Sequence, residues 1–133
     1  MSNELITPRI LVCPQDKLHF FATNFETGFS SKNISYFVGI DADQKFPQRL
    51  LGGDDNFEIN RTPEKSGLLN LFTNLSITWD ASRHTQYKEH FWTQTKSLGN
   101  IAMSDGSVQQ VNSDDLQKAF YQTGLATNRL ALP

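Results

Sequence analysis

The residues of this 133-residue chain that could do chemistry are its acidic turns, its three histidines and its single cysteine. Oxygen-rich turns suit Ca²⁺, and the candidate ligands are Asp41, Asp43, Asp54, Asp55 and Asp105. Their spacing matches neither an EF-hand loop nor another dedicated cage, and turns favour Asp for their own backbone hydrogen bonds. We therefore expect no metal and no cofactor, and a structural Ca²⁺ in these turns is the alternative.

Catalytic arrangements are not expected either. His84 and His90 lie six residues apart, which is not the i, i+4 spacing of a helical zinc pair. Cys13 ends an apolar run, Ile10–Cys13, that precedes Pro14, where a thiol behaves as a small inert hydrophobic group. No nucleophile elbow or phosphate-binding glycine loop is present in the sequence. The chain is accordingly predicted not to be an enzyme, with no catalytic and no cofactor-binding residues.

The residues that would have to be positioned lie on short strands separated by turns. The clearest signal is a β-hairpin over Gly99–Val111, with Asp105-Gly106 as a two-residue type I′ loop. This loop pairs Met103 with Val108, and it places Ile101, Met103 and Val108 on one buried face. The further expected strands are residues 10–13, 33–40, 49–52, 57–59 (an edge strand) and 75–79.

One helix is predicted over residues 113–123. Ser113 suits the N-cap, Asp114 and Asp115 suit the first turn, and Gly124 ends the helix. Residues 61–67 and 81–98 are expected to be loops, and residues 125–133 a tail. Strands with one closing helix predict a single α+β domain whose mainly antiparallel sheet carries the C-terminal helix packed on it.

Bulk composition adds little about partners. The net charge of −2 gives no general attraction to nucleic acid. No stretch reaches the roughly 18–20 apolar residues that a membrane-spanning helix needs.

Several segments resemble one bacterial family. Cys13-Pro14-Gln15-Asp16 resembles the Cys-Pro-Ser-Asp element of pseudopilin-like proteins, and residues 33–56 resemble the centre of one subgroup. The remaining similar segments are Trp79-Asp80, Arg83-His84, Gly99–Ala102, Asp105–Val108 and Asn128–Ala131. That subgroup has a prepilin-type N-terminal methylation helix and a C-terminal His-spacer-Asp-Gly signature, and it is similar to type II secretion pseudopilins.

The resemblance implies a pilin-head-like globular domain over residues 1–133 that serves as a structural or assembly subunit. It further implies an exported protein on the periplasmic side of the inner membrane or in the cell envelope. Its partners would be other pseudopilin-like subunits or envelope proteins, with no nucleic acid, and membrane contact would occur only through an N-terminal helix missing from this chain.

The same resemblance assigns structural-motif roles to His84, Gly99, Asn100, Asp105 and Gly106. The spacer between His84 and Asp105 is longer than in the family, because residues 85–98 look inserted. The alternative function is a soluble extracytoplasmic module that binds glycan or Ca²⁺ through the acidic turns and the Tyr87–Trp92 segment.

Overall fold

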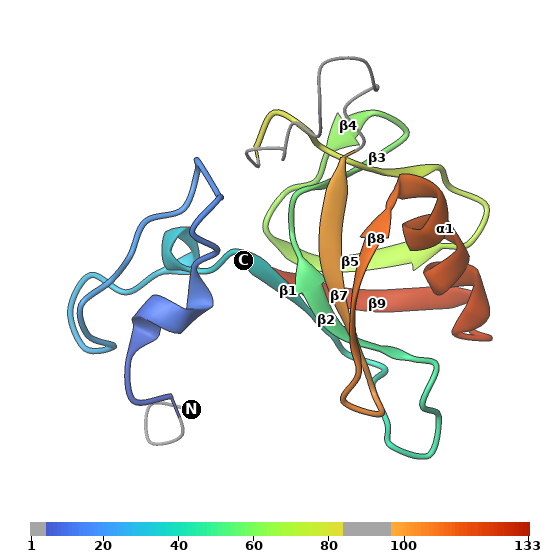
Figure 1. The fold of residues 1–133 in the computed structure, drawn as a ribbon, viewed down its shortest axis with the longest axis horizontal. Helices are drawn as coiled ribbons and strands as arrows, with labels where there is room; N and C mark the ends of the chain where they lie inside the picture. Colours follow the sequence, from blue (N-terminus) through green and yellow to red (C-terminus); the bar gives the residue numbers. More distant parts are fainter. Residues whose placement is uncertain (1–4, 84–96) are drawn as a thin grey trace.

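The computed structural model describes residues 5–83 and 97–133, which form two antiparallel sheets and one α-helix (Figure 1). The larger sheet has six strands in the order β5-β9-β1-β2-β7-β8, and the smaller has the order β4-β3-β6. The predicted α+β class is confirmed. The strands are β1 (Tyr36–Gly39), β2 (Leu50–Asp54), β3 (Phe57–Ile59), β4 (Thr62–Pro63), β5 (Gly67–Phe72), β6 (Ile77–Trp79), β7 (Leu98–Met103), β8 (Val108–Asn112) and β9 (Thr127–Leu132).

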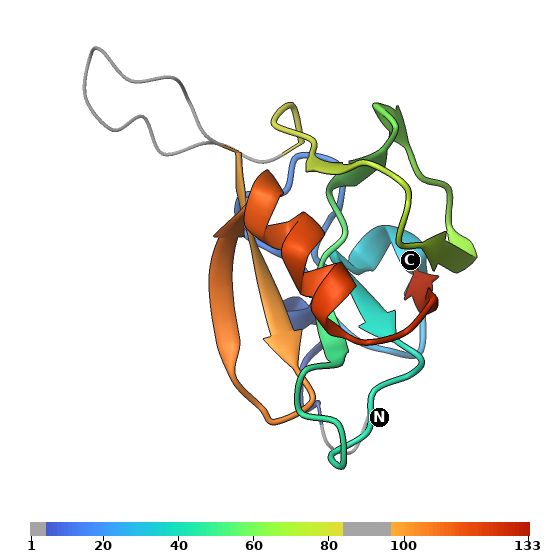
Figure 2. The same ribbon diagram turned by 90° about the vertical axis from the view of Figure 1, so that its right-hand side faces the viewer.

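Helix α1 (Ser113–Gln122) packs its apolar side against the inner face of the sheets (Figure 2). Leu116, Ala119 and Phe120 follow the helical spacing and are buried. A line of aromatic rings crosses this core, because Phe57 meets Phe37 edge-on at 5.7 Å and meets Phe120 at 6.4 Å. Edge-to-face contacts of this kind add to the free energy gained from burying the rings.

The N-cap of α1 lies one residue earlier than predicted. Asn112 caps the helix, and its side chain accepts a hydrogen bond from the Asp115 amide at 2.9 Å. The Ser113 hydroxyl instead accepts a hydrogen bond from the backbone N–H of Trp79 on β6. Gly124, with φ of +74°, follows the helix as predicted, since a left-handed residue ends a helix most easily as glycine.

The hairpin between β7 and β8 is present, but its loop is longer by one residue than predicted. Gly106 N–H donates to the Met103 carbonyl, and Met103 N–H donates to the Ser107 carbonyl, both at 2.9 Å. This pattern is a type I turn followed by a left-handed glycine, with φ of +86° at Gly106. The register therefore pairs Ala102 with Val108, and Val108 lies on the exposed face rather than in the core.

The type I′ turn of this fold lies elsewhere, in the hairpin of β3 and β4. Ile59 pairs with Thr62 across a two-residue loop, Asn60-Arg61. Both loop residues have positive φ, 50° and 63°, as a type I′ turn requires. Residues 61–67 were predicted to be a loop, and this hairpin corrects that prediction. It also makes β3 the central strand of its sheet instead of an edge strand.

Two other strand predictions were wrong. Residues 10–13 do not form a strand, because Pro8 begins a 3₁₀ helix, η1 (Pro8–Leu11). A second 3₁₀ helix, η2 (Ser31–Asn33), lies just before β1. The predicted tail contains β9, an interior strand of the larger sheet that lies between the edge strand β5 and β1. The strands expected within residues 33–40, 49–52 and 75–79 are present as β1, β2 and β6.

The outer face of the six-stranded sheet carries one apolar residue per strand in a single row. Backbone register connects the row across all six strands, and we call it the apolar row. Val38 is 54% exposed, Leu68 67% and Val108 68%, and the other three members are half-buried. Its members, from β5 to β8, are Leu68, Ala131, Val38, Gly52, Ala102 and Val108.

The N-terminal segment, residues 5–35, and α1 lie on opposite sides of the six-stranded sheet, as Figures 1 and 2 both show. Within the part of the chain that the structure describes, no helix is both long enough and apolar enough to span a bilayer.

Candidate functional site

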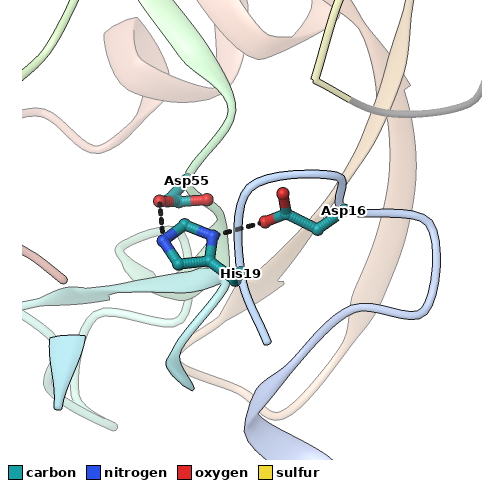
Figure 3. Close-up of side chains that lie close together, drawn as sticks. All are labelled: Asp16, His19 and Asp55. Atoms are coloured by element: carbon teal, nitrogen blue, oxygen red, sulfur yellow. Dashed lines mark hydrogen bonds and ion pairs between the residues drawn. The ribbon is translucent and has the colours of Figure 1, made fainter. Parts of the chain in front are cut away.

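Four charged or titratable side chains meet at the junction of the N-terminal segment with the sheets. Imidazole Nδ1 of His19 donates a hydrogen bond to Asp16 Oδ2 at 2.6 Å, and its Nε2 lies 4.0 Å from Asp55 Oδ2 (Figure 3). Arg83 Nη2 donates to both oxygens of Asp55, at 2.9 and 3.0 Å, and lies 3.7 Å from Asp16 Oδ2. We call these four residues the ion-pair cluster.

Local turns set the position of Asp16. The Asp16 amide donates to the Cys13 carbonyl at 3.0 Å, closing a β-turn in which Pro14 occupies its preferred second position. Asp16 Oδ1 then accepts a hydrogen bond from the Leu18 amide at 2.9 Å. Because one carboxylate oxygen is fixed by the backbone, the other is directed at His19.

Asp55 and Arg83 come from the loops that follow β2 and β6. Arg83 Nη1 also donates to the backbone carbonyl of Asp55 at 3.0 Å, so the guanidinium binds both the side chain and the main chain of Asp55. The Arg83 carbonyl accepts a hydrogen bond from Lys17 N–H at 3.1 Å. The cluster therefore connects three segments that are far apart in the sequence.

The cluster is nearly closed to solvent. The side chain of Asp16 is 0% exposed, and those of His19, Asp55 and Arg83 are 13%, 8% and 14% exposed. Burial by itself raises the pKa of Asp16, but the hydrogen bond from His19 and that from the Leu18 amide outweigh it, and the pKa lies below its ordinary value. The carboxylate of Asp16 is thus held in its charged form.

The geometry suits charge pairing better than catalysis. In a hydrolytic triad the imidazole nitrogen opposite the carboxylate faces a nucleophile. Here the Nε2 atom of His19 faces a second carboxylate, Asp55. That nitrogen is therefore directed at a carboxylate, and an ionised carboxylate has no proton to transfer.

Asp16, His19 and Asp55 also offer one ligand atom each within 4.8 Å of one another, the only such group among residues 5–83 and 97–133. A cation at this point would compete with the guanidinium of Arg83, which already occupies both oxygens of Asp55. The donor set is therefore that of an ion-pair network, with the positive charge supplied by the chain itself.

The structure does not bring the predicted Ca²⁺ ligands together. Asp41 accepts from Arg129 Nε at 2.9 Å, Asp43 from the Lys45 amide at 2.9 Å, and Asp105 from the Ser107 amide at 2.9 Å. Asp54 Oδ2 accepts from the Asn100 amide at 2.7 Å, and only Asp55 belongs to the three-residue group above. These four carboxylates therefore accept from separate donors, local amides for Asp43 and Asp105 and distant strands for Asp41 and Asp54.

The predicted structural-motif residues have separate roles. Asn100 binds Asp54 through both its amide N–H and its side-chain Nδ2, Asp105 accepts within its turn, and Gly106 provides positive φ. Gly99 lies beneath the Trp79 ring. His84 lies outside the described residues, as do His90 and the Tyr87–Trp92 segment.

Sequence reasoning did not identify Asp16, His19 or Arg83 as members of one site. The only signal lay in the expected family resemblance, which stays a prediction and which singled out Cys13–Asp16, residues 33–56 and Arg83-His84. Asp16, Asp55 and Arg83 come from these three segments and meet in the ion-pair cluster.

Neither the cysteine nor the surface hollow offers a better site. Burial raises the pKa of the Cys13 thiol, which disfavours the reactive thiolate. The hollow beside Asp41 and Arg129 is shallow and far smaller than a ligand pocket.

No family model matches the chain, and neither the curated proteins nor the solved structures include a match to it.

Proposed function

We propose that this chain is a structural or assembly subunit, the globular head of a pseudopilin-like protein of the bacterial cell envelope or secretion apparatus. The observation that carries the proposal is the apolar row, which runs the full width of the six-stranded sheet on the face opposite α1. Contiguous exposed apolar surface on a folded domain typically marks a contact with another protein.

The position of the row favours a contact surface over a ligand site. Its members project from six strands of one sheet, so they form a broad surface held in fixed register by the backbone. Val38 lies at the centre of this surface, on a strand that is paired on both sides. A rigid apolar surface loses little conformational entropy when it packs against a partner.

The ion-pair cluster also supports a structural function, because its contacts hold the fold together. Its four side chains bond to one another and to the backbone, and they fasten the N-terminal segment to the sheets. Residues from the segments that resemble the pseudopilin-like family thus have structural roles in this cluster. The subunit would then act by shape and contact, without carrying out a reaction.

The test replaces the central member of the row in cells that make the protein. Val38→Lys places a charge in the middle of the surface, and Tyr121→Lys is the matched control, because Tyr121 on α1 is also 54% exposed. We expect chemical cross-linking of the cell envelope to give a ladder of assemblies containing the wild type and the control. Val38→Lys should lose the ladder while keeping a normal melting temperature.

Two outcomes would count against this proposal. One is an equal cross-linking pattern for Val38→Lys and wild type. The other is a rise of several degrees in melting temperature with Ca²⁺ that EDTA reverses, which would favour the alternative binding module. The codons upstream of Met1 give an independent check, since the proposal expects a prepilin-type leader and an apolar helix there.

A further inference from the structure

Strand β5 forms one edge of the six-stranded sheet and is its least protected strand. It runs for six residues, Gly67–Phe72, and among residues 5–83 and 97–133 it pairs only with β9. No residue from position 66 to position 76 is charged or proline. Long, neutral, apolar edge strands readily accept another strand, and proteins usually protect them with charges, proline or a covering element.

The other sheet edges are protected in one of these ways, or they present a shorter or more polar strand. Strand β4 is two residues long and includes Pro63. The edge of β6 is covered by α1, where Ser113 Oγ and Gln117 Oε1 accept from the amides of Trp79 and Ile77. At the far edge of the larger sheet, β8 presents the polar Gln109 and Gln110, and its last residue, Asn112, caps α1.

The hydrogen-bond pattern shows which groups of β5 face outward. Ile40 N–H donates to the Arg129 carbonyl at 2.9 Å, so Arg129 directs its backbone groups toward β1. Asn70 is the β5 partner of Arg129, and the backbone groups of Asn70 therefore point away from β9, toward the free edge. Alternation along the strand gives Leu68 and Phe72 the same direction.

We propose that β5 is a homodimer interface, at which β5 of a second copy of this chain pairs antiparallel about a two-fold axis at Asn70. In this register Asn70 opposes Asn70 of the second copy, and Leu68 opposes Phe72. The Asn70 pair exchanges two backbone hydrogen bonds. Each Leu68–Phe72 pair adds one, from Phe72 N–H to the Leu68 carbonyl, because the Phe72 carbonyl already accepts from Leu75 N–H at 3.2 Å, so the interface has roughly four in all. The proposal does not depend on the proposed function. Leu68 is shared with the apolar row, but Asn70 at the proposed axis lies outside that row, so trapping at Asn70 tests the edge alone.

The sequence of the edge is self-complementary in this register. Leu68 would contact Phe72 on the outer face, and Leu69 would contact Leu71 on the inner face, while the two Asn70 amides meet at the axis. Because the segment is uncharged, two copies approach without like-charge repulsion. A two-fold, isologous interface also closes on itself, which yields a dimer and leaves no free β5 edge for further growth.

Disulfide trapping tests the register directly. In a Cys13→Ser background, Asn70→Cys places two thiols at the axis with Cα atoms about 5.5 Å apart, which a disulfide can span. Gln110→Cys is the matched control, because alternation from the Met103–Ser107 pair makes Gln110 the outward middle residue of the opposite edge. We expect Asn70→Cys to form a covalent dimer at least tenfold faster than Gln110→Cys under mild oxidation.

Sedimentation of the full chain gives the second readout. Leu68→Lys should weaken dimerisation by at least about tenfold, since it sets a lysine against Phe72 of the second copy. Tyr121→Lys, on α1 and outside both the β5 edge and the apolar row, should change it less than about twofold. A wild type that is monomeric at millimolar concentration, or equal trapping at positions 70 and 110, would overturn the proposal.

Discussion

The six-membered ring of Trp79 lies directly against the α-carbon of Gly99. A Cβ atom on Gly99 would fall 2.6 Å from ring atoms Cη2 and Cζ2, well inside van der Waals contact. The same indole donates from Nε1 to the Val111 carbonyl at 2.9 Å, so the ring cannot easily tilt away. This relationship joins β6 to the β7–β8 hairpin and accounts for glycine at position 99.

Gly99→Ala should therefore destabilise the fold by about 1–3 kcal/mol, the usual cost of forcing extra volume into a packed core. Urea denaturation followed by tryptophan fluorescence measures this loss. A Trp79→Phe background provides the control, because the smaller ring leaves room for the methyl group and the cost should shrink. An equal cost in both backgrounds would mean that the ring is not the obstacle.

Gly106→Val should cost about 1–2 kcal/mol, because a β-branched residue resists the φ of +86° found there. Gly106→Asn is the matched control, since Asn tolerates the left-handed region better and should cost less. Thermal melts of the two variants separate a conformational effect from a packing effect. Open space surrounds the position, so a large cost for both variants alike would not fit a φ-dependent penalty.

Arg61→Gly should stabilise the protein by roughly 0.5 kcal/mol. Arg61 holds a φ of 63° in the type I′ turn, and this backbone conformation costs a residue with a Cβ about 1–2 kcal/mol. Glycine removes that cost but gains conformational entropy in the unfolded chain, which offsets part of the stabilisation. Arg61→Ala removes the charge and retains the backbone cost, so it should leave the unfolding free energy nearly unchanged. A gain for both variants would point to charge instead of conformation.

Acid should weaken the fold partly through Asp16. Its folded-state pKa is lower than its unfolded value of about 3.9, so its contribution to stability is complete above that value. The contribution is lost as the pH falls through the lowered folded-state pKa. Urea unfolding between pH 7 and pH 2 should show Asp16→Asn less stable at pH 7 by about 1–3 kcal/mol, with a flatter decline below pH 4.

A matched variant separates this effect from general acid denaturation. Asp114 lies on the first turn of α1, outside the ion-pair cluster, so Asp114→Asn should alter the pH profile less than Asp16→Asn does. A profile for Asp16→Asn that is parallel to wild type throughout would remove Asp16 as the titrating group.

The sequence predicted the place of the hairpin but not its register. A glycine with positive φ serves a two-residue type I′ loop and a three-residue loop equally well, so Asp105-Gly106 is compatible with both. Only the burial of Val111 in place of Val108 distinguishes them, and that depends on tertiary packing. Conversely, Asn60-Arg61 forms the type I′ turn without the glycine that would have identified it.

Strand β9 was missed because one inward position is polar. Asn128 interrupts the apolar alternation around Leu130, yet it is buried and its Nδ2 donates to the carbonyl of Phe120 at 3.2 Å. That partner is a carbonyl in the last turn of α1, which local pattern reasoning cannot identify. The ion-pair cluster escaped prediction for a similar reason, because its members are separated by up to 67 residues and meet only in the fold.

The place of β9 has a consequence for how the protein folds. Strand β5 and one side of β1 gain their sheet partner only when Thr127–Leu132 pairs with them, so the larger sheet closes through its last strand in sequence. Pairing between strands so far apart in the chain is slow, which makes this closure the expected late step of folding.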